Sequence, residues 1–379
     1  MKKIVINSNT LWSVSNFRYD LIRTLVQSGY QVICLASIDE ISTSSYDRLK
    51  STDAEIIEIS MDRKGTNPLK DSAYLIRLIQ IFRQVAPDVV LNYTPKPNIY
   101  SSLACRFLGI PYINTINGLG SGFTSGFPIT TIIRQLYKLA LRKSKQVFVQ
   151  NKDDLDFLLK SRISPLDVTS FIPGSGIDTA AYCKDEKRIP VPDALKFIYA
   201  GRLIKEKGVY DFIYLAEKLK GKYPNCRFWV VGFIDEGNPS SLTSIELDEL
   251  SSSGIIEYKG KTDNIVEYLN ASDIMIFPST YREGMPRILL EAASCSMPIV
   301  TYDVPGCREV VTDGYNGYLC DPGNREQLID VCEQILNMQQ SEIVQLGDNG
   351  RGMATSNFSI ELVNNHYTTL LKEILKPLI

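Results

Sequence analysis

The feature that most constrains the fold is an alternation between short β-branched runs and longer amphipathic stretches, which occurs in both halves of the chain. In the first half the apolar runs are KKIVINS, YQVICLAS, DVVLNYT, PYINTI and QVFVQN. After a polar stretch that contains prolines, the alternation restarts with KFIYAGR, CRFWVVG, IIEYKG, DIMIFPS and PIVTYD. Strands that alternate with helices in this way predict right-handed βαβ units and parallel sheets.

The repeated alternation predicts an α/β protein with two Rossmann-like domains whose parallel sheets face a central cleft, the default place for a ligand. A length of 379 residues suits two domains better than one core. We assign residues 1–180 to an N-terminal domain and 181–360 to a C-terminal domain, with a linker near 178–195. Residues 361–379 are expected to form a C-terminal helix that could cross back to the N-terminal domain.

Composition and charge narrow the class of protein. With 44% hydrophobic and 22% charged residues, the chain has the composition of a soluble globular protein. We find neither a signal-peptide core nor an apolar run of about 18 residues, and therefore expect a cytoplasmic protein. Residues 1–180 carry a net charge of +6 and residues 181–379 a net charge of −8. The basic half suits anionic partners.

Cysteine and histidine usage argues against several kinds of site. The eight cysteines show no C-x-x-C pair and no zinc-type spacing, so we expect reduced thiols that are mostly buried. The single histidine, His366, makes histidine triads and His-rich metal sites improbable. No Walker loop occurs, and no G-x-G-x-x-G follows the first strand. GLGSG at 118–122 lacks the spacing of a dinucleotide loop.

The segment AGRLIKEKG, residues 200–208, places cations at the end of a predicted strand. Arg202, Lys205 and Lys207 follow the strand directly, and a helix is expected to begin near Gly208. Cations at the carboxyl end of a strand, beside a helix N-terminus, form a diphosphate site. An ordinary solvated basic loop is the alternative.

The stretch YREGMPRILLEAASCSMPIV, residues 281–300, carries two glutamates on a turn and a helix. Gly284 lets backbone approach a ligand, and Pro286 is expected in the first helical turn. Glu283 then lies at the start of the helix and Glu291 about two turns inside it. With no His, Asp or Cys at coordinating spacing they make a poor metal site, and they suit sugar hydroxyls better. The alternatives are a helix-capping acid for Glu283 and a solvent-facing residue for Glu291.

These motifs together resemble a known family. EGMPRILLE, with GRLIKEKG upstream and DVPGCREVVTDGYNGYLCDPGN downstream, resembles glycosyltransferase family 4, which comprises retaining enzymes of the GT-B fold. In the first half, TPKPNIYSSLACRFLGIPYINTINGLGSGF and IPGSGID resemble a bacterial branch of that family. That branch extends lipid-linked O-antigen and capsule oligosaccharides.

The resemblance implies roles for individual residues of the donor site. Arg202 and Lys207 would hold the donor diphosphate and Glu283 would contact the sugar, which makes these three the catalytic residues. Glu291 would bind the ribose hydroxyls of the nucleotide. The remaining donor contacts would come from the backbone of Gly284 and Met285 and from the loop of Lys261 and Thr262.

The family needs no metal ion or other cofactor, and we expect none here. DDLD at 153–156, which opens a predicted helix, is interpreted as a capping cluster rather than a metal motif. The two cations and a helix N-terminus would stabilise the charge that develops on the departing diphosphate. In the retaining reaction the acceptor attacks from the leaving-group face, and a phosphate oxygen takes its proton.

The basic half supplies candidates for the acceptor. Lys96 follows a predicted strand and could meet the acceptor diphosphate, while Asn9, Asn16 and Arg18 could meet its sugar hydroxyls. A helix cap at Ser15 or Asn16 is the alternative there. Many members of the family carry a histidine where this chain has Asn117, whose amide could still donate a hydrogen bond.

The segment TTIIRQLYKLALRKSKQ, residues 130–146, predicts a basic amphipathic helix. Arg134, Lys138 and Arg142 lie at i, i+4 and i+8, with Ile133, Leu136 and Leu139 turned elsewhere. Such a helix can lie on anionic lipid, and a solvated surface helix is the alternative. We expect peripheral association with the inner face of the plasma membrane.

The sequence thus predicts transfer of a hexose or N-acetylhexosamine from a nucleotide sugar, most simply a UDP-sugar, to a lipid-diphosphate-linked saccharide of O-antigen or capsule, with retention. No nucleic-acid partner is expected. The alternatives are a non-catalytic nucleotide-sugar-binding subunit of a polysaccharide assembly and a GT-B-like nucleotide-sugar epimerase.

Overall fold

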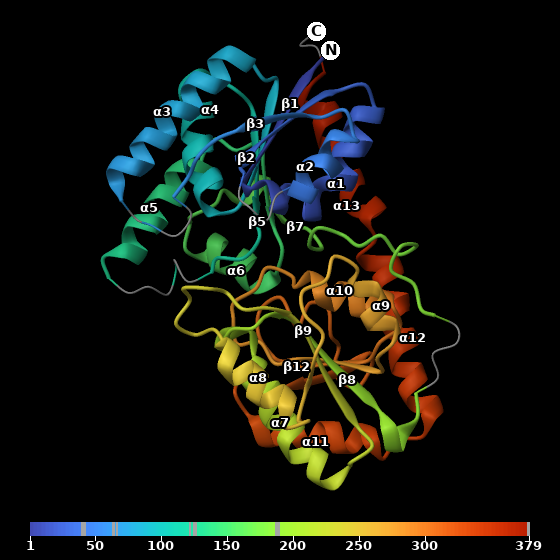
Figure 1. Ribbon diagram of the computed structural model, residues 1–379. Helices are drawn as coiled ribbons and strands as arrows, with labels where there is room; N and C mark the ends of the chain where they lie inside the picture. Colours follow the sequence, from blue (N-terminus) through green and yellow to red (C-terminus); the bar gives the residue numbers. More distant parts are fainter. Residues whose placement is uncertain are drawn as a thin grey trace. The chain divides into compact units, whose positions relative to one another are not determined.

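The chain folds into two compact units. The computed structural model describes residues 1–38, 43–62, 65, 67–120, 123, 127–185 and 190–376. Unit 1 comprises Met1–Ser175 and Ile360–Ile379, and unit 2 comprises Gly176–Ser359. Each unit has its own parallel sheet with helices packed against it (Figure 1).

The described residues of unit 1 form a seven-stranded sheet in the order β3-β2-β1-β4-β5-β6-β7, with every strand pair parallel. The strands are β1 (Lys3–Thr10), β2 (Gln31–Ser37), β3 (Glu55–Glu58), β4 (Val89–Tyr93), β5 (Tyr112–Ile116), β6 (Gln146–Val149) and β7 (Thr169–Phe171). The helices are α1 (Leu11–Gln27), α2 (Thr43–Lys50), α3 (Pro68–Val85), the π-helical turn η2 (Pro97–Ser101), α4 (Ser102–Leu108), α5 (Ile129–Leu141), α6 (Lys152–Lys160), the short turn η4 (Leu166–Val168) and α13 (Ile360–Ile374). The strand order reverses between β1 and β4.

Local sequence sets the start of α1. Thr10, the last residue of β1, has extended backbone angles and its side chain accepts a hydrogen bond from the Ser13 N–H. This satisfies one of the N–H groups that the first helical turn leaves without a partner. A cap at Ser15 or Asn16 is therefore wrong, because both residues lie inside the helix.

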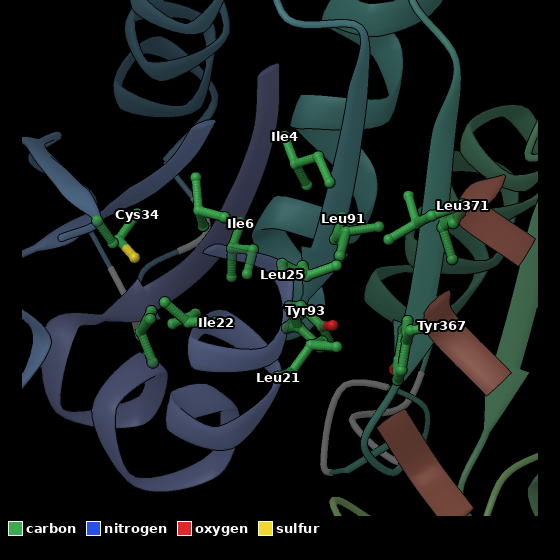
Figure 2. Close-up of a cluster of buried hydrophobic side chains, with 14 of the residues drawn as sticks. Ile4, Ile6, Leu21, Ile22, Leu25, Cys34, Leu91, Tyr93, Tyr367 and Leu371 are labelled. Atoms are coloured by element: carbon green, nitrogen blue, oxygen red, sulfur yellow. The ribbon is translucent and has the colours of Figure 1, made fainter. Parts of the chain in front are cut away.

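The C-terminal helix α13 packs into the core of unit 1. Val363, Tyr367 and Leu371 belong to the same buried cluster as Leu91 and Tyr93 of β4, and Figure 2 shows Tyr367 and Leu371 of α13 in this cluster. The Tyr367 hydroxyl lies 2.7 Å from Thr115 Oγ1 in β5. The helix begins at residue 360, and residues 377–379 lie outside the described part of the chain.

The described residues of unit 2 form a six-stranded parallel sheet in the order β10-β9-β8-β11-β12-β13. The strands are β8 (Lys196–Arg202), β9 (Arg227–Phe233), β10 (Glu257–Tyr258), β11 (Ile274–Phe277), β12 (Ile299–Tyr302) and β13 (Gly317–Cys320). The helices are the short turns η5 (Pro192–Ala194) and η6 (Lys205–Lys207), α7 (Val209–Lys222), α8 (Ser244–Ser252), α9 (Ile265–Asn270), α10 (Arg287–Ser294), α11 (Arg325–Leu336) and α12 (Gln340–Asn357). Here the order reverses between β8 and β11, a point where open α/β sheets bind ligands beyond the strand carboxyl ends.

The described part of the predicted linker is held to unit 2. The Asp185 N–H donates to Asn270 Oδ1 at 3.1 Å, and the Cys183 carbonyl accepts a hydrogen bond from the same asparagine side chain at 2.9 Å. Residues 186–189 of that stretch lie outside the described part of the chain. The eight cysteines are free, and all except Cys183 are buried, which confirms the expectation for them.

Candidate functional site

Arg202 is the last residue of β8 and lies at the strand-order reversal of unit 2. Its Nη1 is 3.2 Å from Asp235 Oδ2, in the loop that follows β9. The Tyr199 hydroxyl donates to the Arg202 carbonyl at 2.7 Å and fixes the end of the strand. Because the Arg202 side chain stays 39% exposed, it can still reach an anionic ligand.

The loops that follow β8 and β11 are hydrogen-bonded to each other. The N–H groups of Thr280 and Tyr281 donate to the Glu206 carbonyl at 2.9 and 3.0 Å. Gly208, which precedes α7, has a φ of 85°, and a Cβ on it would lie 2.1 Å from the Pro278 carbonyl oxygen. Only glycine fits this close approach, so the N-terminus of α7 is held at the reversal point.

Lys207 and Glu283 form an ion pair across these two loops. The Lys207 Nζ also lies 5.6 and 5.5 Å from the ring centroids of Phe277 and Tyr281. Both charged side chains are mostly buried. The structure thus brings together two residues that the sequence assigned to different parts of the donor.

The turn 283–286 does not follow the predicted capping pattern. Helix α10 begins at Arg287, so Pro286 occupies the N-cap position rather than the first turn. Glu283 is not the capping residue, which makes that alternative wrong. The turn is instead braced by Gly306, where a Cβ would lie 2.4 Å from the Gly284 carbonyl oxygen. Met285 is buried.

Glu291 lies in a buried charged cluster on α10. Only 8% of Glu291 is exposed, so the solvent-facing alternative is wrong. Arg287, one helical turn earlier, donates from Nε to Glu291 Oε1 at 2.9 Å, and Tyr182 also hydrogen-bonds to the carboxylate. Burial raises the pKa of Glu291 above its ordinary value, although both partners act in the opposite direction. Arg351 fixes Tyr182 by donating to its carbonyl at 2.7 Å.

Lys261 and Thr262 lie beyond the end of β10, which β9 separates from β8 in the sheet. Lys261 is exposed, with its Nζ 5.9 Å from the ring centroid of Phe233. The Thr262 hydroxyl accepts a hydrogen bond from the Asn264 N–H at 3.0 Å. Parallel strands present their carboxyl ends at one edge, so both residues share the edge that carries Arg202.

In unit 1 the predicted acceptor residues fall into two groups. Arg18 is buried and stacks 4.0 Å from the ring centroid of Tyr93, and its Nη2 donates to Asn117 Oδ1 at 3.4 Å. Lys96 pairs instead with Asp71 at 2.5 Å, and the Tyr100 hydroxyl donates to the same carboxylate.

The two remaining acceptor candidates follow the first strand. Asn9 lies near the end of β1, where its carbonyl accepts a hydrogen bond from the Ser37 hydroxyl at 2.5 Å. Asn16 lies inside α1. The structure therefore joins Arg18 to Asn117 but gives Lys96 a separate carboxylate partner.

The DDLD segment stabilises the glycine-rich loop of unit 1. Asn151 is the N-cap of α6. The carboxylate of Asp154 accepts one hydrogen bond from the Asn151 side chain and one from the Leu119 N–H, each at 3.0 Å. Residues 121 and 122 of GLGSG lie outside the described part of the chain. Among the described residues we find no group of three His, Cys, Asp or Glu side chains placed to hold a metal ion.

Comparison with known proteins identifies the family. A family model described as glycosyl transferases group 1 matches residues 184–353, which include the cluster around Arg202, Glu283 and Glu291. A model described as glycosyl transferase 4-like matches residues 7–151. The chain belongs to the glycosyltransferases.

Individual relatives of this glycosyltransferase carry names that specify the sugar transfer or the pathway. It is 27% identical over 350 residues to N,N'-diacetylbacillosaminyl-diphospho-undecaprenol alpha-1,3-N-acetylgalactosaminyltransferase of Campylobacter jejuni, with 88% of each chain covered. It is 24% identical to the capsular polysaccharide biosynthesis glycosyltransferase CapM of Staphylococcus aureus, over 88% of this chain and 90% of the relative. The crystal structure of Anabaena Alr3699/HepE in complex with UDP has a TM-score of 0.79 at 16% identity, covering 98% of this chain and all of the other. That likeness shows the fold, which is GT-B.

Helix α5 of the glycosyltransferase carries the predicted basic face. Arg134 and Lys138 are exposed, and Arg142 follows the end of the helix. Ile133 and Leu136 pack against the core cluster around Tyr137 and Leu141. Leu139, which was predicted to turn away from the cations, is 45% exposed. In the described part of the chain, no helix is both long enough and apolar enough to cross a bilayer.

Sequence reasoning missed three residues that contact Arg202 or Glu291. Arg287 lies four positions before Glu291, and that spacing on a predicted helix is a recognised ion-pair signal. Asp235 and Tyr182 carry no comparable signal. They reach Arg202 and Glu291 only because the chain folds back over 33 and 109 positions.

Proposed function

We propose that this glycosyltransferase moves a hexose or N-acetylhexosamine from a UDP-sugar to a lipid-diphosphate-linked saccharide, with retention of anomeric configuration and without a metal ion. The observation that carries the proposal is the placement of Arg202 and Lys207 at the strand-order reversal of unit 2, beside Glu283. Two cations and the N-terminus of α7 converge there, which suits a diphosphate.

The cations supply the chemistry of the leaving group. Breaking the bond between the sugar and the phosphate leaves negative charge on the diphosphate, which fixed positive groups stabilise most strongly in a site shielded from water. Arg202 and Lys207 both have carboxylate partners, Asp235 and Glu283. A bound diphosphate would take these cations as its own partners, and Glu283 would then be free to accept hydrogen bonds from the donor sugar.

Glu291 suits the nucleotide rather than the reacting bond. Its buried carboxylate is held in place by Arg287 and Tyr182, and such a fixed acceptor can bind the paired hydroxyls of a ribose. The match to a structure solved with UDP supports a uridine nucleotide. In the retaining reaction the acceptor hydroxyl attacks on the face that the diphosphate leaves, and a phosphate oxygen takes the proton.

The acceptor is proposed from the relatives and from the charge of unit 1. The name of the Campylobacter relative specifies a diphospho-undecaprenol acceptor, and the Staphylococcus relative acts in capsule synthesis. Residues 1–180 carry a net charge of +6, which favours an anionic lipid-linked substrate at a membrane surface. We propose that the protein works on the inner face of the plasma membrane, where both substrates are accessible.

The test is a panel of nucleotide sugars with an undecaprenyl-diphosphate-linked sugar as acceptor. One donor should release its nucleotide and raise the acceptor mass by one sugar residue, with the α-anomeric configuration of the donor retained and with no loss of rate in a chelator. Glu291→Ala and Arg202→Ala should each lower kcat/KM about tenfold or more, because each removes a charged hydrogen bond worth about 1.5–3 kcal/mol. No mass gain with any donor, or full activity in both variants, contradicts the proposal.

A further inference from the structure

A pocket on unit 1 lies beside α5 and is separate from every site residue predicted from the sequence except Lys138 and Arg142. It has a volume of 460 Å³ and lies between α5 and the segment after α6. Lys138, Arg142 and Arg162 supply three cations to its walls, and Leu159, Ile163 and Leu166 supply apolar surface. Small-molecule sites in proteins begin at about 300 Å³, so the pocket has room for a phosphate-bearing headgroup.

The three cations have no carboxylate partner within the described part of unit 1. The acidic side chains that form ion pairs there use other cations, in the pairs Asp88–Lys2, Asp20–Arg23, Asp62–Lys70, Asp71–Lys96 and Asp156–Lys160. On the α5 side the sequence carries no acidic residue, because residues 89–152 contain eight Lys and Arg and no Asp or Glu, whereas Asp156 and Asp167 flank the segment that carries Arg162. The residues that line the pocket include three cations and no Asp or Glu, so its walls favour an anion.

Arg162 occupies a backbone position that is unfavourable for arginine. Its φ is 52°, in the left-handed region where glycine or asparagine is usually found. A long cationic side chain at such a position costs backbone strain without any packing gain at an exposed site. The position closes the end of α6, where the Ile163 N–H donates to the Leu158 carbonyl at 2.9 Å, and a residue without charge could close the helix in the same way.

Exposed apolar side chains decide which anion fits. Leu166 in the pocket wall is 77% exposed, and on α5 Leu139 and Ile132 are exposed beside the cations. A soluble phosphate gains nothing from exposed leucines, whereas a phospholipid offers them its acyl chains next to its headgroup. We infer that this pocket binds the phosphate headgroup of an anionic phospholipid and so docks unit 1 on the bilayer. The inference deepens the membrane association that we propose for the protein.

The test measures binding of the full chain to vesicles of phosphatidylcholine with and without phosphatidylglycerol. Arg142→Gln and Arg162→Asn should each weaken binding to the phosphatidylglycerol vesicles about fivefold or more, given about 1 kcal/mol per cation at an anionic surface. Arg134→Gln is the matched control, because Arg134 is exposed on the same helix but does not line the pocket. The fold-loss of vesicle binding in Arg134→Gln should be less than half of that in Arg142→Gln or Arg162→Asn. Equal losses in all three variants, or no loss in Arg162→Asn, overturn the inference.

Two further readouts separate the alternatives. Asparagine suits a φ of 52°, so Arg162→Asn should melt no lower than the wild type, and a clear drop in Tm together with lost binding would assign the residue a structural role instead. Glycerol phosphate at millimolar concentration should not displace the protein from vesicles, and displacement would point to a soluble phosphate ligand. Arg162→Asn should retain its rate on a short-chain, soluble acceptor. Loss of that rate contradicts docking as its role, whereas failure of the wild type on any acceptor would bear on the proposed function alone.

Discussion

The ion pair between Arg287 and Glu291 gives a prediction that can be worked through from the structure. The two side chains meet at 2.9 Å and are 21% and 10% exposed, so water replaces the arginine poorly if it is removed. In Arg287→Gln, Glu291 loses a charged hydrogen bond worth about 1.5–3 kcal/mol. If the carboxylate holds the donor nucleotide, kcat/KM for the donor should fall about 10- to 150-fold, mainly through KM.

The same substitution should change the pH dependence of the reaction. The groups that face Glu291 are Arg287 and Tyr182, and burial already raises its pKa while the arginine lowers it. Removing Arg287 raises that pKa further, so the acidic limb of kcat/KM should move to higher pH. Steady-state kinetics of donor turnover across the acidic range measure both effects.

The controls for this prediction come from the same unit. Arg287→Lys keeps the charge and should retain most of the activity and the wild-type acidic limb. Arg227→Gln removes an arginine paired with Glu257 at the amino end of β9, the opposite edge of the sheet, and should leave donor kinetics unchanged. An unchanged KM and an unmoved acidic limb in Arg287→Gln would refute the role of the pair, as would an equal effect of Arg227→Gln.

Three predictions concern the stability of the framework. Gly208→Ala should lower the free energy of unfolding by roughly 1–3 kcal/mol, because the new methyl group would meet the Pro278 carbonyl and the backbone has a left-handed φ. Chemical denaturation measures this change, and an unchanged midpoint would contradict the close approach of Gly208 to Pro278. Tyr367→Phe removes the 2.7 Å hydrogen bond to Thr115 and should cost about 0.5–1.5 kcal/mol, with wild-type stability as the contrary result. Burial raises the folded-state pKa of Glu291 above the ordinary pKa of 4.5. The contribution of this pKa shift to folding stability is therefore present below pH 4.5 and is lost as pH rises through the raised pKa. Melting curves should therefore show Glu291→Gln gaining on the wild type as pH rises, and a constant difference contradicts this.

The sequence predicted the parts of the fold that depend on local periodicity. Buried parallel strands read as continuous apolar runs such as DIMIFPS, and the segments between them have helical spacing, so both sheets could be predicted. The motif around Arg202 and Glu283 followed from the rule that ligands lie at strand carboxyl ends. Both residues indeed flank the β8–β11 reversal.

The parts that escaped prediction depend on contacts between distant positions. Asp235 pairs with Arg202 across 33 positions, and nothing in the loop after β9 indicates which cation it will meet. Leu139 was expected to turn away from the cations, but the sequence did not indicate that it would stay 45% exposed while Tyr137, Ala140 and Leu141 fill the buried face of α5. Helical spacing predicts an apolar face, but it does not settle which residues at the boundary of that face are buried. The ion pair between Lys207 and Glu283 joins loops from two neighbouring strands, and only the sheet order sets that contact.

The most direct test of the central claim is to compare the binding of UDP with that of uridine by titration calorimetry. If Arg202 and Lys207 form the diphosphate site, the wild type should bind UDP much more tightly than uridine. The double variant Arg202→Ala, Lys207→Ala should bind the two nearly equally, while Arg227→Ala should retain the preference for UDP. A double variant that still prefers UDP as strongly as the wild type would contradict the account.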